Sequence, residues 1–295
     1  MSHDLAASIA QLQGEIGRPL DIVQEFYDWT DPFPDGNPAD GTYGTIPYQT
    51  YQTPGATYMV TWGNYTGKLT NHDITDGSED ANIRAHAEAL KDFGHPVFLR
   101  FDSEMNGWWY PWGGTKNGAA GIGPASYVAM WRHVHDIFAE VGATNVTWVW
   151  VVSANSNPDV AWNNIQAYYP GNAYVDWVGA DEYDFSRSTG FGCPCSVKNI
   201  FGPSYEAMQQ FAPGKPYMIA ETGNGPGAKY TDQQYYSQLA AWAAAHPNLK
   251  ALVWFDTDDN GQFRTDLTAS GEQAFKALVN QPPFTVALRL PGTGP

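Results

Sequence analysis

Basic residues are scarce in this 295-residue chain, which carries 15 Lys and Arg against 31 Asp and Glu and a formal net charge of −16. A surface of this sign repels phosphate backbones and anionic membranes. No apolar run reaches the roughly 18 residues that a transmembrane helix needs. We therefore expect no nucleic-acid partner and no membrane span.

Cysteine is almost absent, since the chain has only Cys193 and Cys195, in a C-P-C loop. Such a close pair is compatible with a local disulfide, two free thiols or half of a metal site. Because no other cysteine is present, a structural metal is the least favoured of the three.

Aromatic residues, in contrast, make up 15% of the chain, with 12 Trp and 17 Tyr. Trp and Tyr combine a flat apolar face with one hydrogen-bonding group, which suits the apolar faces of sugar rings. The alternative is a core built from large side chains. As a set, these residues favour a carbohydrate ligand.

Seven apolar runs alternate with stretches of helical periodicity, the pattern of repeated βα units around a parallel sheet. The predicted strands are 21–29, 57–63, 96–103, 146–153, 175–183, 216–221 and 251–257. The predicted helices are 4–17, 79–93, 124–142, 204–212, 231–246 and 270–280. Helix starts are expected at Ser78 or Glu79, Pro124 and Thr231, and helix ends at Gly94 and Gly142. No linker or repeat interrupts the series, so we predict one α/β domain over residues 1–295, a (β/α)8 TIM barrel.

Two glutamates each end a predicted strand just before turn-forming residues: Glu104 in FDSEMNGWWYPWGG and Glu221 in YMIAETGNG. The carboxyl ends of barrel strands converge on one face, and glycoside hydrolysis needs two carboxyl groups there. The alternative is that both glutamates pair with arginines or cap helices. Trp108, Trp109 and Trp112 favour the first interpretation, because an aromatic cluster beside a strand-end acid is typical of a sugar-binding wall.

Five stretches in order resemble successive motifs of glycoside hydrolase family 26. They are PVFLRFDSEMNGWWYPWGG, NVTWVWVVSAN, YYPGNAYVDWVGADEYDF, KPYMIAETG and ALVWFDTDDNGQFRTD, within residues 20–280. The E-M-N-G-W block together with the later E-T-G is the specific part of the match. The family is known chiefly for β-mannanases, with some lichenases and β-1,3-xylanases.

The resemblance implies a role for single positions. Glu104 matches the acid/base and Glu221 the nucleophile, which implies retention of configuration and carboxyl groups on the order of 5 Å apart. Arg100 matches an arginine that holds carboxylates ionised and oriented. Tyr183 matches a tyrosine that contacts the nucleophile, and Trp254 matches the aromatic floor beneath the sugar being cleaved.

Two positions depart from the family pattern. Ser103 stands where the family usually has His, and a short hydroxyl there should change which sugar hydroxyls are recognised, which puts mannan specificity in doubt. Glu182 stands where a small residue is more usual. It either points into the cleft and binds a sugar hydroxyl or lies outward as a solvated turn residue, and the first alternative is slightly favoured.

The resemblance implies that Glu104 closes the fourth barrel strand and Glu221 the seventh, so the predicted strands 21–29 and 57–63 become the second and third. No candidate for the first barrel strand then remains at the N-terminal end. The β-prone run 284–290 follows the last predicted helix, in the place next to strand eight. One interpretation is a circularly permuted barrel closed by this strand. The other is that 284–295 forms a linker tail.

These observations together predict a retaining endo-β-glycanase for a neutral β-linked polysaccharide or oligosaccharide, foremost of β-mannan type. The alternatives are a lichenase, a β-1,3-xylanase, a glycosidase for another bacterial glycan, and a non-catalytic carbohydrate-binding barrel. We expect no cofactor and no metal, because the calcium-like run 256–261 has Leu267 where a bidentate Glu is needed. We expect a monomer that works outside the cell, although the N-terminus lacks a signal-peptide pattern.

Overall fold

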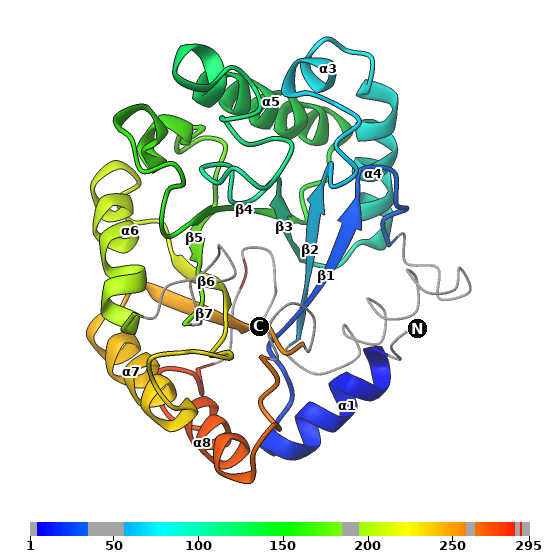
Figure 1. Cartoon of the computed structure of the whole chain (residues 1–295). Helices are drawn as coiled ribbons and strands as arrows, with labels where there is room; N and C mark the ends of the chain where they lie inside the picture. Colours follow the sequence, from blue (N-terminus) through cyan, green and yellow to red (C-terminus); the bar gives the residue numbers. More distant parts are fainter. Residues whose placement is uncertain (1–4, 35–55, 185–194, 258–262, 287–289, 291–295) are drawn as a thin grey trace. The chain divides into compact units, whose positions relative to one another are not determined.

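The structure, a computed structural model, describes residues 5–34, 56–184, 195–257, 263–286 and 290. The chain divides into two compact units, residues 20–177 with 289–295 and residues 1–19 with 178–288. We call them the β1–β4 unit and the β5–β7 unit after their strands (Figure 1). Both are α/β in architecture with parallel strands.

The β1–β4 unit pairs its strands in chain order, and β2, β3 and β4 are buried along their whole length. Its strands are β1 (Ile22–Asp28), β2 (Thr57–Gly63), β3 (Val97–Phe101) and β4 (Val146–Ser153). Its helices are α3 (Asn71–Thr75), α4 (Asp80–Phe93), α5 (Ala119–Val141) and the 3₁₀ turns η1 (Ala161–Asn163) and η2 (Ile165–Tyr168). Burial on both faces is typical of strands that helices cover in an α/β fold.

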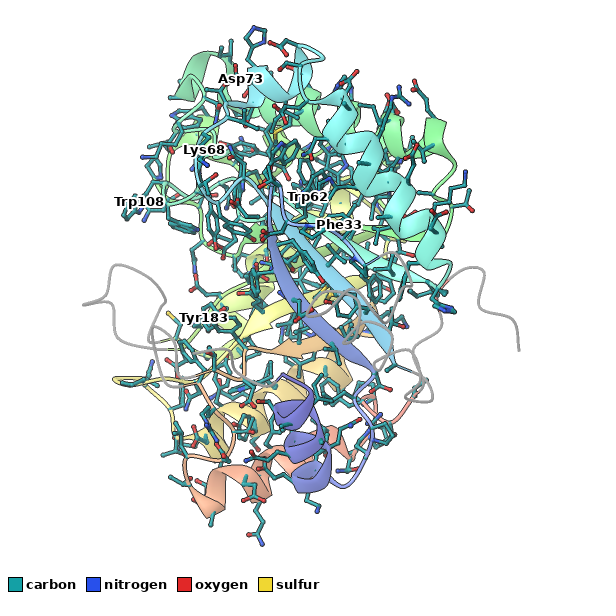
Figure 2. The ribbon with its side chains drawn as sticks, turned by 90° about the vertical axis from the view of Figure 1, so that its right-hand side faces the viewer. Phe33, Trp62, Lys68, Asp73, Trp108 and Tyr183 are labelled. Atoms are coloured by element: carbon teal, nitrogen blue, oxygen red, sulfur yellow. The ribbon has the colours of Figure 1, made fainter. Side chains whose placement is uncertain are left out.

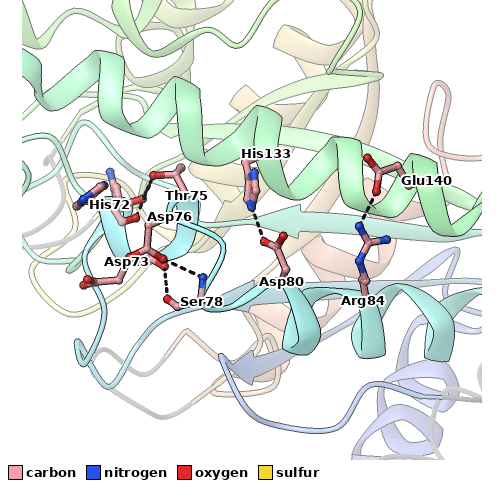
Figure 3. A network of polar contacts seen from close by, with 10 residues as sticks. His72, Asp73, Thr75, Asp76, Ser78, Asp80, Arg84, His133 and Glu140 are labelled. Carbon is pink, nitrogen blue, oxygen red and sulfur yellow. Dashed lines mark hydrogen bonds and ion pairs between the residues drawn. The ribbon is translucent and has the colours of Figure 1, made fainter.

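Two side-chain contacts, a hydrogen bond and an ion pair, join α4 to α5 (Figure 3). His133 Nε2 lies 2.7 Å from Asp80 Oδ1, and Arg84 Nη2 lies 2.6 Å from Glu140 Oε2. All four side chains keep solvent contact, so water screens both contacts and each contributes little to stability. The apolar faces of the two helices, rather than these charges, hold them on the sheet.

The β5–β7 unit contains β5 (Trp177–Asp181), β6 (Tyr217–Thr222), β7 (Leu249–Trp254), α6 (Val197–Phe211), α7 (Asp232–Ala245) and α8 (Ala269–Val279). The N-terminal helix α1 (Leu5–Ile16) also belongs to it and lies beside α8 (Figure 1). Arg18 Nη1 donates to the carbonyls of Val279, at 2.8 Å, and Phe284, at 2.6 Å. Asn280 Nδ2 donates to the Ile16 carbonyl at 2.8 Å.

All seven predicted strands are confirmed, and so are four helix boundaries. Glu79 is the residue before the first turn of α4, and Thr231 caps α7 in a capping box with Gln234. Gly94 and Gly142 end α4 and α5 with φ of +70° and +81°. Glycine reaches this left-handed conformation without steric cost.

Two predicted helix starts are wrong, because both helices begin before a proline that lies inside the helix. Helix α5 starts at Ala119, five residues before Pro124. Helix α6 starts at Val197, where the Ser196 side chain accepts the Asn199 N–H and caps the first turn.

The first three residues of the predicted strand 284–290 are not in a strand. Residues 284–286 form a turn in which Phe284 N–H donates to the Gln281 carbonyl at 2.9 Å and Val286 N–H to the Pro283 carbonyl at 3.3 Å. Two preceding prolines have no N–H to offer a strand ladder, which favours a turn. Residues 287–289 lie outside the described part of the chain.

Large rings fill the core of the β1–β4 unit. Trp62 stacks on Trp29 at 4.5 Å between ring centroids, and Phe33 and Phe101 contact Trp62 at 5.1 and 5.2 Å. Figure 2 shows Trp62 and Phe33 together inside the unit. A share of the aromatic residues therefore serves packing, as one of the two interpretations of the composition expected.

Asp102 buries a carboxyl group directly after β3. Its Oδ1 accepts the Asn64 N–H at 3.3 Å, whereas Oδ2 has no hydrogen-bond partner among the residues that the structure describes. Its backbone is left-handed, with φ of +38°. Burial raises the pKa of the Asp102 carboxyl well above its usual range.

Gly63→Ala should destabilise the protein, because a Cβ at this position would lie only 2.7 Å from the buried Trp112 ring. We expect the free energy of unfolding to fall by about 1–3 kcal/mol. Gly14→Ala is the matched control, since a Cβ there meets nothing within 4 Å; helix propensity should then raise stability by about 0.5–1 kcal/mol. Urea unfolding of both variants tests this, and equal effects would contradict it.

Asp102→Asn should change how stability depends on pH. Above about pH 4 the unfolded chain ionises Asp102 while the folded protein keeps it protonated, so its contribution to stability is lost as pH rises toward the raised pKa. Asparagine does not titrate. As pH rises, the free energy of unfolding of the variant should therefore increase relative to that of the wild type, by up to about 1.4 kcal/mol per pH unit. Denaturant titrations at several pH values measure this difference. If the difference in the free energy of unfolding between variant and wild type did not change with pH, the pKa of the Asp102 carboxyl would not be raised by folding.

Candidate active site

Glu104 leaves β3 in a sparsely populated backbone conformation, with φ of +57°. Its N–H donates to the Val151 carbonyl of β4 at 2.9 Å, and its carbonyl accepts the Gly107 N–H at 2.9 Å. A left-handed glutamate costs on the order of 1 kcal/mol and persists only where its surroundings fix it. These bonds turn the chain sharply and hold the carboxyl at the end of the strand.

The Glu104 carboxyl receives an indole N–H. Trp109 Nε1 donates to Glu104 Oε2 at 2.8 Å, which fixes the orientation of the carboxyl plane. Trp109, which the sequence predicts as part of a sugar-binding wall, thus contacts Glu104 directly. The bond gives Trp109 a positioning role in addition to any contact with a sugar.

Asn106, in the E-M-N-G block, anchors the Glu104 loop to β4. Its Oδ1 accepts the Ser153 N–H at 2.9 Å, and its Nδ2 donates to the Ser153 carbonyl at 2.8 Å and to Ser156 Oγ at 3.0 Å. Its own carbonyl accepts from Asn163 Nδ2 at 2.8 Å. Asn106 is a functional residue that the sequence patterns do not predict, although its place two residues after Glu104 is a signal.

Trp112 lies in the interior, only 1% exposed. Its Nε1 donates to the Ser103 carbonyl at 2.6 Å, and its ring stacks on Tyr110 at 4.4 Å. A ring so placed has no free face for a sugar and instead fixes the backbone next to Glu104. Ser103 itself is buried beneath this loop.

A line of aromatic rings runs from Glu104 over the β1–β4 unit. Tyr110 contacts Trp109 at 6.5 Å and Tyr65 at 5.7 Å, and Tyr65 contacts Phe26 at 6.3 Å. Trp108 is 45% exposed and Phe26 is 42% exposed. Figure 2 shows Trp108 at the edge of its unit, away from Trp62 and Phe33. Tyr65 and Phe26 escaped the sequence analysis because they lie far from Glu104 in the chain.

Arg100 is buried in β3, in register with Thr61 of β2 and thereby with Phe26 of β1. Its Nη1 lies 3.4 Å from Thr61 Oγ1, and its guanidinium carbon lies 6.0 Å from the Phe26 ring centroid. A guanidinium over an aromatic face is favourable, most of all when water is excluded. The strand before Glu104 thus carries a fixed positive charge.

In the β5–β7 unit, Glu221 lies near the end of β6 and Tyr183 follows β5. The Tyr183 hydroxyl donates to Glu221 Oε2 at 2.5 Å. The contact that the resemblance implied for Tyr183 is present. A hydrogen bond from a rigid phenol fixes the orientation of the carboxyl plane.

Glu182 and Asp184 flank Tyr183, and both are buried. Glu182 is 8% exposed and its Oε1 accepts the Tyr183 N–H at 3.1 Å, so the side chain is no solvated turn residue. Asp184, which the sequence analysis did not single out, accepts the N–H groups of Lys229 and Tyr230, each at 3.1 Å. Burial raises the pKa of Asp184. The hydrogen bonds from Lys229 and Tyr230 lower it, but by less, so the pKa stays above its usual value. Asp184 therefore ties the end of β5 to the loop that follows β6.

Trp254 lies at the end of β7 but packs toward the helices. Its ring contacts Tyr236 of α7 at 5.0 Å and Phe275 of α8 at 5.6 Å, and its Nε1 donates to the Phe263 carbonyl at 2.7 Å. The next residue, Phe255, contacts the Tyr183 ring at 5.9 Å instead. Trp254 is thus joined to the surroundings of Glu221 through Phe263.

Among the described residues, no three His, Cys, Asp or Glu side chains are grouped so that they could hold a metal ion. Cys195 is disulfide-bonded, which removes the free-thiol alternative for that residue, and Cys193 lies outside the described part. No helix in the described segments is both long and apolar enough to cross a membrane.

Comparison with known proteins points to a single family. The sequence model of Glycosyl hydrolase family 26 matches residues 55–232. Endoglucanase H of Acetivibrio thermocellus is 30% identical over 286 residues, covering 94% of this chain and 29% of that protein. Mannan endo-1,4-beta-mannosidase A and B of Caldalkalibacillus mannanilyticus is 32% identical over 195 residues, covering 64% of this chain and 34% of that protein.

A solved family 26 β-mannanase from Bacteroides ovatus shares the fold, with a TM-score of 0.66 at 17% identity over 92% of this chain and 82% of that one. The chain spans about a third of the length of the two sequence relatives. The matched family pattern covers more than half of the chain and includes both strand-end glutamates. The chain therefore belongs to glycoside hydrolase family 26, a family of retaining enzymes.

Proposed function

We propose that the chain is the catalytic part of a retaining endo-β-glycanase, with Glu104 as acid/base and Glu221 as nucleophile. The main support for this proposal is that the two carboxyl groups have similar surroundings. Each lies at or just after the end of a parallel strand and accepts a hydrogen bond from an aromatic side chain, Trp109 in one case and Tyr183 in the other. Membership of a retaining family supplies the reaction type.

In the first step a Glu221 oxygen attacks the anomeric carbon and the glycosidic C–O bond breaks. The proton of Glu104 moves to the leaving oxygen, so the departing sugar leaves as a neutral alcohol. In the second step water attacks the same carbon, Glu104 takes the proton of that water, and Glu221 is released as a carboxylate. The Tyr183 hydrogen bond stabilises the charge on Glu221 before and after the covalent intermediate.

A neutral, extended polysaccharide fits the described surface. The aromatic line from Trp108 through Tyr65 to Phe26 offers apolar faces on the same unit as Glu104. The net charge of −16 disfavours acidic glycans. We propose β-mannan first, and β-glucan as the alternative, because the relatives are named as a mannosidase and an endoglucanase.

The parallel strands and their helices are further proposed to form a (β/α)8 barrel. Support comes from family 26 structures that match more than nine-tenths of the chain with TM-scores of 0.64 and 0.66. No eighth strand occurs in the described ranges, because residues 284–286 form a turn. Action outside the cell stays a proposal that follows from a polysaccharide substrate.

Reducing-sugar release from mannan, glucomannan, mixed-linkage β-glucan, β-1,3-xylan and arabinogalactan should identify the substrate. We expect release from mannan or glucomannan and a loss of at least about 10³-fold in Glu221→Gln, because an amide cannot form the covalent intermediate. Glu206→Gln is the matched control, since Glu206 is an exposed residue of α6. Equal loss in Glu206→Gln would indicate misfolding, and full activity in Glu221→Gln would refute the nucleophile.

Substrates with different leaving groups distinguish the role of Glu104 from that of Glu221, because only a poor leaving group needs a proton from Glu104. With an aryl β-glycoside whose phenol needs no proton, Glu104→Gln should still show a rapid burst of phenol followed by slow turnover. On the polysaccharide the same variant should lose about 10²–10⁴-fold. Stopped-flow absorbance measures the burst. Equal losses on both substrates would assign Glu104 a role other than proton transfer.

A further inference from the structure

Phe263 is a buried ring that faces the tyrosine at Glu221. It is 3% exposed and lies in the described segment that follows β7. Its ring centroid is 4.8 Å from that of Tyr183, with the planes tilted by 33°, so the two rings overlap in part. Phe255 contacts the same Tyr183 ring edge-on at 5.9 Å. The phenol therefore packs against two rings that both follow β7 and that also contact each other.

The backbone around Phe263 is fastened to the end of β7. Trp254 Nε1 donates to the Phe263 carbonyl at 2.7 Å, and the Phe263 N–H donates to the Thr257 carbonyl at 2.7 Å. Two residues later, the Thr265 N–H donates to Asp256 Oδ1 at 2.8 Å. The position of the Phe263 ring is thus set by three bonds to residues 254–257.

The ring also lies against the chain that carries Glu221. A Cβ at Gly223 would lie 2.5 Å from Phe263 Cδ1, closer than any side chain tolerates. Glycine at this position therefore lets the ring approach the backbone two residues after Glu221. Phe263 thus packs on Tyr183, the donor of the Tyr183–Glu221 bond, and lies beside the backbone two residues after the acceptor.

We propose that Phe263, held by Trp254, is a positioning residue for the Glu221 carboxylate and acts through the Tyr183 hydroxyl. The proposal rests on the proposed role of Glu221 as nucleophile. A phenol hydroxyl at 2.5 Å from the carboxylate is effective only while the ring is fixed, because a shift of about 1 Å at a catalytic contact can cost up to about 10²-fold in rate. Trp254 then serves catalysis through its N–H and Phe263, in addition to any contact with the sugar.

The test is a double-mutant cycle on the polysaccharide that the panel above identifies. Phe263→Leu keeps an apolar side chain but removes the aromatic face, and Tyr183→Phe removes the hydroxyl. We expect Phe263→Leu to lower kcat about 10-fold with KM changed by less than about 2-fold, the pattern of an interaction lost in the transition state. In the Tyr183→Phe background the same substitution should change kcat by less than about 2-fold, because the coupled contact is already gone.

Phe201→Leu is the matched control, since Phe201 is an equally buried ring of the same unit that packs on Trp242. It should lower the melting temperature without changing kcat. Gly223→Ala gives a second route if Phe263→Leu folds poorly, because the added Cβ displaces the Phe263 ring while leaving it aromatic. Its effect on kcat should also vanish in the Tyr183→Phe background.

The outcomes separate this proposal from the one on which it rests. If Glu221→Gln abolishes activity but Phe263→Leu keeps full kcat, or loses the same factor with and without the Tyr183 hydroxyl, Phe263 is only structural and the positioning role is overturned. If Glu221→Gln stays active, or no polysaccharide is cut, the proposed function and the positioning role fail together.

Discussion

A side-chain carboxylate at the end of a parallel strand needs hydrogen-bond donors, and the backbone ladder of the sheet supplies none to a side chain. In both units an aromatic side chain donates to it, the Trp109 indole to Glu104 and the Tyr183 phenol to Glu221. Such donors are rigid, since two side-chain torsions place the whole ring. Neighbouring rings and loops fix those torsions, so aromatic packing sets the directions of both carboxyls.

This arrangement explains why the chain needs so many large rings. Some, such as Trp62 and Trp29, fill the core. Others, such as Phe263, pack against a ring that donates a hydrogen bond to a carboxyl group, here Tyr183 to Glu221. In the described part of the chain, only a few, with Trp108 foremost, keep much of their surface in solvent. The composition pointed to sugar binding as a whole, but it could not assign a ring to one of these three roles.

The sequence predicted the strands and the two strand-end glutamates, because apolar runs bounded by turn residues are a local property. It missed where α5 and α6 begin, because the residues before Pro124 and Pro203 read as loop until their packing is known. It could not give the direction of Trp254, since neighbouring residues at a strand end face opposite sides and a shift of one residue exchanges them. Asn106 and Asp184 act through backbone groups of other segments, and no local pattern reveals such bonds.

The placement of α1 beside α8 has a consequence for biosynthesis. The two helices share one compact unit, yet about 250 residues separate them in the chain. At roughly 5–20 residues per second a ribosome takes on the order of 10–50 s to cover that distance. Residues 20–177 are continuous and can collapse during this interval, whereas α1 must wait for its partner with an apolar face uncovered. Until α8 has left the ribosome, α1 therefore keeps an apolar face open to aggregation and to chaperones.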